Sequence, residues 1–131
     1  MHSFPVRVYY EDTDMAGIVY YANYLRFIER ARSAWVRGMG IDQMAMKADG
    51  VVFAVRRLEA DYIAPAQFDD VLEVRTRLAM ATPARMVLEQ GVWRDDEEIF
   101  RASVTIVCIA ASGKPARLPA KLRLMQSPKP D

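Results

Sequence analysis

The sequence predicts an α+β fold in which one long central helix is wrapped by a curved antiparallel sheet of five strands. Three observations lead to it: one amphipathic helical segment, four strand-like segments in series after it, and short turns between those strands. A chain of 131 residues suits one compact domain. We therefore expect residues 1–131 to form a single domain, with a loose tail over residues 128–131.

The long helix is predicted over residues 22–37. Its apolar side chains recur at three- and four-residue spacing and form one stripe: Tyr24, Phe27, Ile28, Ala31, Ala34 and Trp35. Asn23 is a candidate N-cap, and Gly38 with Gly40 signals the end of the helix. A second, shorter helix is expected over residues 41–49.

The strands are predicted from alternation and from β-forming residues. The expected segments are residues 5–10, 51–62, 71–78, 86–93 and 99–110. The short connections among the last four favour antiparallel pairing over crossover units. A curved sheet wrapped around the helix would bury its apolar stripe, and this arrangement is a hotdog-like α+β fold.

Composition excludes several classes of function. The 18 basic and 17 acidic residues give a net charge of +1, which does not support a general nucleic-acid or membrane-surface binder. No secretory h-region and no apolar run long enough to span a membrane are present. A single cysteine excludes an intrachain disulfide. We therefore expect a cytoplasmic protein that is not inserted in a membrane.

The scarcity of histidine and cysteine limits the possible chemistry. His2 is the only histidine and lies at an end that we expect to be mobile, so Ser-His-Asp and Cys-His arrangements are disfavoured. Metal sites built on histidine and cysteine lack ligands, and no Walker A loop is present. Cys108 lies in the middle of an apolar strand, where core packing is expected. The remaining possibilities are catalysis by carboxylates or no catalysis.

Three carboxylates, Glu11, Asp12 and Asp14, precede the long helix. The unpaired N–H groups at the start of a helix carry partial positive charge and can polarise a carbonyl oxygen. A carboxylate beside such a helix start would suit hydrolysis. An acidic turn before a helix can equally serve only turn and capping chemistry, and that role is expected for Asp12.

Five segments resemble the YbgC-type members of the 4-hydroxybenzoyl-CoA thioesterase family, which has the hotdog fold. They are residues 8–14 (VYYEDTD), 17–24 (GIVYYANY), 25–33 (LRFIERARS), 62–70 (YIAPAQFDD) and 113–119 (GKPARLP). The resemblance extends over about residues 5–120, and its first block is long and specific. It implies an acyl-CoA thioesterase that releases a carboxylic acid and free CoA.

Carried over by position, the resemblance implies that Asp14 is the catalytic carboxylate, acting as general base or as nucleophile. The backbone N–H of Tyr21 would polarise the thioester carbonyl. Most YbgC-like members have His where this chain has Tyr21, and Tyr is similar to the aromatic-substrate branch; the acyl group could be short-chain aliphatic or aromatic. Further substrate-binding residues are expected on two parts of the chain: Gly17, Ile18, Val19, Tyr20, Asn23 and Tyr24 on one, and Thr82, Arg85 and Arg117 on the other.

The resemblance also bears on partners. It implies no metal and no cofactor, because coenzyme A is part of the substrate, and it implies a homodimer or tetramer. An acyl carrier protein is a possible partner. The alternative function is a non-catalytic partner that binds acyl-CoA or acyl carrier protein, associated with the Tol–Pal and phospholipid machinery. A hotdog dehydratase is disfavoured because it needs a histidine in the site.

Overall fold

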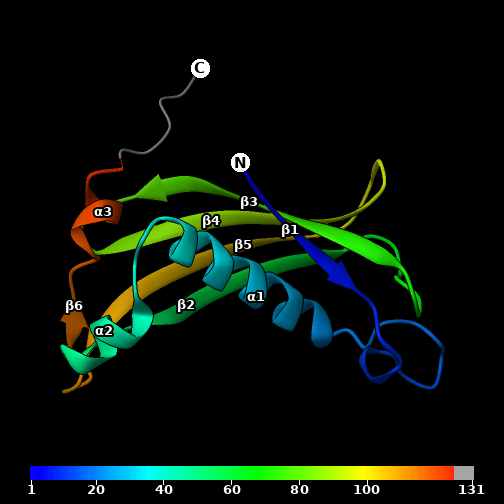
Figure 1. Cartoon of the computed structure of the whole chain (residues 1–131), viewed down its shortest axis with the longest axis horizontal. Helices are drawn as coiled ribbons and strands as arrows, with labels where there is room; N and C mark the ends of the chain where they lie inside the picture. The colour runs from blue at the N-terminus through cyan, green and yellow to red at the C-terminus, as the bar shows by residue number, and fades with distance from the viewer. Residues whose placement is uncertain (126–131) are drawn as a thin grey trace. The chain divides into compact units, whose positions relative to one another are not determined.

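The computed structural model describes residues 1–125 (Figure 1), so the expected tail over residues 128–131 lies outside the described residues. The elements in chain order are β1 (His2–Arg7), a 3₁₀ turn (Tyr10–Asp12), α1 (Asn23–Gly38), α2 (Gln43–Ala48), β2 (Val51–Tyr62), β3 (Val71–Ala81), β4 (Arg85–Arg94), β5 (Glu97–Ala110), β6 (Pro115–Ala116) and α3 (Ala120–Arg123). Among the helices of this part of the chain, none is both long and apolar enough to cross a membrane.

The strands form one sheet in the order β1-β3-β4-β5-β2, and β6 pairs with β5. The α+β prediction is therefore confirmed, and the five expected strands are present. The sixth strand, β6, was not predicted, because residues 112–115 carry the signals of a turn. That turn is closed by the N–H of Ala110, which donates to the carbonyl of Lys114, and β6 then pairs antiparallel with Cys108 and Ile109.

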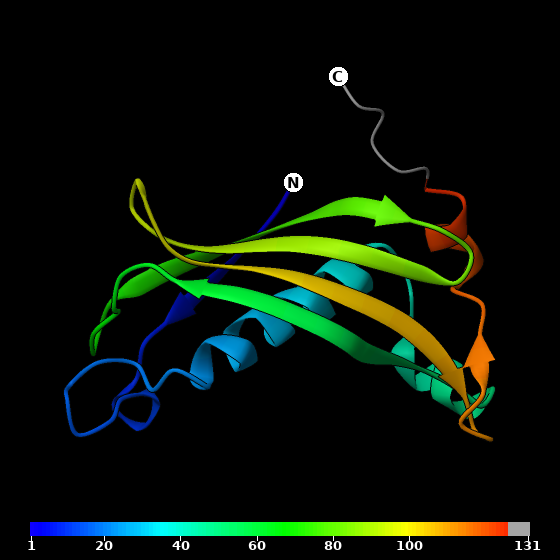
Figure 2. The same ribbon diagram turned by 180° about the vertical axis from the view of Figure 1, so that it is seen from behind.

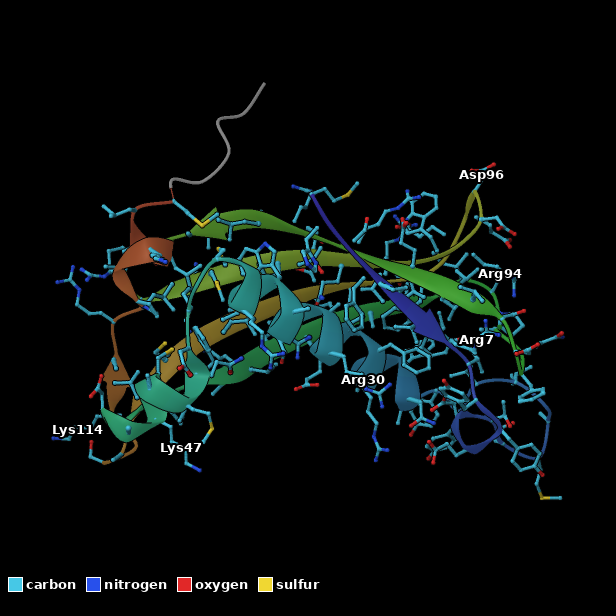
Figure 3. The ribbon with its side chains drawn as sticks, in the orientation of Figure 1. Arg7, Arg30, Lys47, Arg94, Asp96 and Lys114 are labelled. Atoms are coloured by element: carbon cyan, nitrogen blue, oxygen red, sulfur yellow. The ribbon has the colours of Figure 1, made fainter. Side chains whose placement is uncertain are left out.

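The chain groups into two compact units, which we describe separately. The first unit comprises Met1–Trp35, Ala60–Arg77 and Gln90–Ala102. In it α1 packs its stripe against one face of the strand segments (Figures 1 and 2), and Phe27, Ile28 and Ala31 are fully buried. On the opposite side of α1, Arg30 extends away from the strands (Figure 3).

The second unit comprises Val36–Glu59, Leu78–Glu89 and the chain from Ser103 onward. Its core residues are apolar side chains of strands and helix ends: Val36, Ile41, Met86, Leu88, Val104, Ile106, Cys108, Leu118 and Leu122. The carboxylate of Asp42 caps α2 by accepting from the N–H groups of Met44 and Ala45. The buried position of Cys108 confirms the packing role predicted for it.

Two local predictions were wrong. His2 is not at a mobile end, because it is the first residue of β1 and pairs with Thr76 of β3; its Nδ1 atom is buried and has no hydrogen-bond partner in the described part of the chain. Asn23 is not an N-cap, because α1 begins at Asn23 itself. Its side-chain amide donates to the carbonyl of Asp12 and so acts on the preceding loop.

Candidate active site

The loop before α1 is organised around Asp12. The Asp12 side chain is buried, and its Oδ2 atom accepts a hydrogen bond of 2.8 Å from the N–H of Tyr9. The Asp12 carbonyl accepts from the N–H of Tyr20 and from Nδ2 of Asn23, both at 2.9 Å. Asp12 therefore joins the beginning of the loop to the start of α1, which confirms its predicted role in supporting the turn.

Asp14 lies exposed in a tight turn between these two fixed ends. Its carboxylate Oδ1 accepts from the N–H of Ala16 at 2.9 Å, and its backbone N–H donates to the carbonyl of Ile18 at 2.9 Å. Gly17 has a φ of +80°, a conformation that L side chains rarely adopt, and its N–H donates to the carbonyl of Asp14. Within residues 1–125, the second carboxylate oxygen accepts no hydrogen bond, so it is available to a reactant.

The backbone just before α1 offers free donors. The carbonyl of Tyr20 accepts from the N–H of Asn23 at 2.8 Å, and the carbonyl of Tyr21 accepts from the hydroxyl of Tyr62 at 2.9 Å. The N–H groups of Tyr21 and Ala22 have no partner among the described residues. They lie at the positive end of the helix dipole, where a developing negative charge on oxygen is stabilised.

A pocket of about 340 Å³ opens beside these donors. It is lined by apolar and aromatic side chains from two segments: Ile18, Val19, Tyr21, Tyr24, Tyr62, Ile63, Ala64 and Pro65. Burial raises the pKa of Tyr24 and of Tyr62 above the ordinary value, so both hydroxyls remain protonated at neutral pH. Such a pocket suits an apolar or aromatic group with its polar end at the helix start.

The segment of residues 62–70 forms one wall of this pocket. Sequence reasoning did not identify the four residues of this segment that line the pocket, Tyr62, Ile63, Ala64 and Pro65. The N–H of Ala66 donates to the buried hydroxyl of Tyr24 at 3.0 Å, and the carbonyl of Ala66 accepts from the N–H of Val19 at 2.8 Å. These bonds hold the wall against the loop of Asp14. The resemblance of residues 62–70 to the family was the available signal for their place in the pocket.

Arg94 anchors the same wall. Its Nη1 atom donates to the carbonyl of Pro65 and to Oδ2 of Asp70, both at 3.0 Å, and its Nη2 atom donates to Oε1 of Glu97 at 3.1 Å. Hydrogen bonding to the two carboxylates raises the pKa of Arg94. Figure 3 labels Arg94 and also Arg7, which pairs with Asp69, the residue before Asp70. Asp69 and Asp70 thus serve the structure of this segment through ion pairs with Arg7 and Arg94.

The predicted site residues fall in both units. Asp14 and the helix start both belong to the first unit, and the predicted residues Ile18, Val19, Tyr21 and Tyr24 line the pocket. Thr82, Arg85 and Arg117 belong to the second unit. There the Thr82 hydroxyl accepts from the N–H groups of Ala84 and Arg85 and shapes the turn before β4, while the side chains of Arg85 and Arg117 are exposed.

Residues 8–124 match the family model of the thioesterase-like superfamily. The chain belongs to this superfamily. The match spans every segment on which the sequence resemblance was based, and it confirms that resemblance.

Individual relatives agree with the family. The chain is 39% identical over 120 residues to "Acyl-CoA thioester hydrolase YbgC" of Escherichia coli O6:H1, covering 90% of each chain. It resembles the crystal structure of a probable thioesterase from Bartonella henselae, at 39% identity and a TM-score of 0.86, covering 90% of this chain and 98% of the other. A 1,4-dihydroxy-2-naphthoyl-CoA thioesterase from Synechocystis is 25% identical with a TM-score of 0.85, covering 92% and 90%. The hotdog fold is therefore confirmed.

Proposed function

We propose that this protein is an acyl-CoA thioesterase, which hydrolyses the thioester of an acyl-CoA to a carboxylic acid and free CoA. The observation that carries the proposal is a free carboxylate oxygen on Asp14 in the loop that precedes α1, together with unpaired N–H groups at the start of that helix beside an apolar pocket. Membership of the thioesterase-like superfamily and the identity to the YbgC hydrolase support it.

In the proposed reaction, the N–H of Tyr21 donates to the thioester carbonyl and stabilises negative charge on its oxygen. Asp14 either removes a proton from the attacking water or attacks the carbonyl carbon itself and forms a mixed anhydride that water then opens. In both routes the C–S bond breaks, and the CoA sulfur leaves as a thiolate that takes up a proton. The hydrogen bonds of Asp12 join the loop that carries Asp14 to the start of α1, which carries the N–H of Tyr21.

The acyl group would occupy the pocket of about 340 Å³. Three of its lining side chains, Tyr21, Tyr24 and Tyr62, are aromatic, and ring faces and edges favour flat partners. This supports an aromatic acyl group over a long aliphatic chain. The naphthoyl-CoA substrate in the name of the Synechocystis relative is in keeping with that choice.

The CoA nucleotide would be held by Arg85 and Arg117, whose exposed guanidinium groups suit phosphate oxygens. A test compares Arg85→Ala and Arg117→Ala on an acyl-CoA and on the same acyl group carried by N-acetylcysteamine, which has no phosphate. We expect KM to rise only for the acyl-CoA. An equal rise for both substrates would contradict the phosphate role.

A homodimer is also proposed. β2 ends the strand order β1-β3-β4-β5-β2, and in the second unit its residues Val52 and Val55 are 37% and 48% exposed. An edge strand that exposes apolar side chains is a natural pairing site for a second copy. Light scattering should give at least twice the monomer mass, and a monomer at micromolar concentration would refute the assembly.

The central experiment is a thiol-release assay with short-chain, long-chain and aromatic acyl-CoAs. Asp14→Asn should abolish turnover, while Asp96→Asn should not, because Asp96 is an exposed residue at the tip of the β4–β5 turn (Figure 3). No turnover of any substrate by the wild type would refute the enzyme and favour a non-catalytic partner of acyl-CoA or acyl carrier protein. Full activity of Asp14→Asn would refute only the assignment of Asp14.

A further inference from the structure

We propose that Tyr62 is a positioning residue for hydrolysis: its hydroxyl binds the carbonyl of Tyr21 and so orients the N–H of Ala22, a second donor to the thioester oxygen beside the N–H of Tyr21. This inference rests on the proposed function. Tyr62 is the last residue of β2 and lies 41 positions from Tyr21 in the sequence. Its hydroxyl donates to the carbonyl of Tyr21 at 2.9 Å.

The ring of Tyr62 is held in place by three other rings. Its centroid lies 5.6 Å from Tyr24 and 5.0 Å from Phe100, edge to face in both cases, and 6.2 Å from Tyr21. Tyr24 and Phe100 are themselves stacked at 5.0 Å with an interplanar angle of 7°. Edge-to-face packing of this kind fixes the ring plane, so the position of the hydroxyl is set before substrate arrives.

The backbone following Tyr62 is fixed as well. The N–H groups of Ile63 and Ala64 both donate to the carbonyl of Ile99 in β5, at 2.9 and 3.0 Å. The Tyr62 hydroxyl is therefore carried by a strand end that is hydrogen-bonded to the sheet. Tyr62 is 48% exposed, but its hydroxyl reaches a backbone carbonyl instead of pointing only to water.

The effect on the helix start follows from the geometry of a trans peptide, in which C=O and N–H point in opposite directions. The bond from Asn23 to the Tyr20 carbonyl directs the N–H of Tyr21 away from the first turn of α1. The bond from Tyr62 to the Tyr21 carbonyl sets the next peptide and directs the N–H of Ala22 away from the Tyr62 hydroxyl. Two adjacent donors are thus oriented by two separate bonds.

Of these two bonds, only the one from Tyr62 can be removed by a side-chain substitution, because the other joins backbone atoms. The Tyr62 hydroxyl also polarises the amide that it binds, and this strengthens the N–H of Ala22 as a donor. Loss of the hydroxyl would leave the pocket wall in place and release the peptide. The expected defect is therefore in the rate of the chemical step, with substrate binding retained.

The test is Tyr62→Phe, which removes one oxygen and keeps the ring. We expect kcat to fall about tenfold with KM within about twofold of wild type, as for the misplacement of one group in a preorganised site. Tyr10→Phe is the matched control, because Tyr10 is 81% exposed and its ring packs edge-to-face with the exposed ring of Phe68. That control should retain wild-type kcat and KM.

A second readout needs no turnover. In ¹H–¹⁵N spectra of the free protein, Tyr62→Phe should shift the amide resonance of Ala22, because the carbonyl of the same peptide loses its donor. An unmoved Ala22 resonance would overturn the proposal, as would an unchanged kcat or a defect confined to KM. Inactive wild-type protein would instead refute the proposed function, while the Ala22 shift would still report on the Tyr62 bond.

Discussion

Removing the guanidinium of Arg94 tests how far the candidate site depends on the 62–70 wall. In Arg94→Met the hydrophobic stem is kept, and the donors to Pro65, Asp70 and Glu97 are lost. The Asp70 carboxylate retains one local bond, because its Oδ2 atom also accepts from the N–H of Gln67 at 2.9 Å. The carbonyl of Pro65 loses the bond from Arg94.

The size of the expected loss of stability follows from how exposed the side chains bonded to Arg94 are. The side chains of Arg94 and Asp70 are 29% and 25% exposed, so this ion pair is intermediate between a fully buried pair and a fully exposed one. The charged bond to Asp70 should therefore contribute about 1 kcal/mol, and the bond to the Pro65 carbonyl about 0.5–1 kcal/mol. Glu97 is 58% exposed and adds little. The sum is about 2 kcal/mol, which lowers Tm by roughly 6–10 °C for a chain of this length.

Urea unfolding followed by circular dichroism measures this loss, and Arg101→Met is the matched control. Arg101 is 61% exposed, and its Nε atom lies 3.9 Å from Asp61 and 3.6 Å from Glu98, so its removal should cost less than about 0.5 kcal/mol. We also expect Arg94→Met to lose more kcat/KM than Arg101→Met does. Equal stability of Arg94→Met and wild type would refute the anchoring role of Arg94.

Two further predictions concern the buried groups. Gln90→Leu should destabilise the protein by about 2–4 kcal/mol in urea, because the buried Gln90 side chain binds Ile28, Thr76 and the half-buried guanidinium of Arg32, whose pKa is lowered by desolvation. A loss below about 1 kcal/mol would contradict this prediction. Burial raises the pKa of Cys108 from 9.0 to about 11, so stability from its thiol is present below pH 9 and lost as pH rises towards 11. Iodoacetamide at about pH 8 should alkylate Cys108 only in unfolded protein; rapid alkylation of the native state would contradict its burial.

The fold was predictable because its main elements have strong local patterns. The stripe of α1 and the alternation of β3 each identify one buried face, and Phe27, Ile28, Leu72 and Val74 are indeed buried. The first strand was predicted over residues 5–10, whereas β1 spans His2–Arg7, because the N-terminal half of β1 has few apolar residues. It becomes a strand through pairing with β3, from His2 opposite Thr76 onward, and a local pattern contains no information about that partner.

Sequence reasoning could propose Asp14 and the helix start as one site because they lie within a few residues of each other. It did not identify Tyr62 or Arg94, because their roles arise only in the folded chain. Tyr62 reaches Tyr21 across 41 positions, and Arg94 reaches Pro65 across 29. Asn23 shows the same limit at short range: its residue type suits a cap, yet its amide is used by the Asp12 carbonyl.

The presence of the reacting groups and their orientation depend on different parts of the chain. The groups proposed to react, the Asp14 carboxylate and the Tyr21 N–H, lie in one short segment, so their presence depends on local sequence alone. The segment that carries these groups is held by residues 62–70, through the hydroxyl of Tyr62 on the carbonyl of Tyr21 and through the bond from Ala66 to Tyr24. A chain that keeps residues 8–24 and alters the 62–70 wall should therefore keep the fold of the loop and lose rate, because orientation and not composition limits the chemistry.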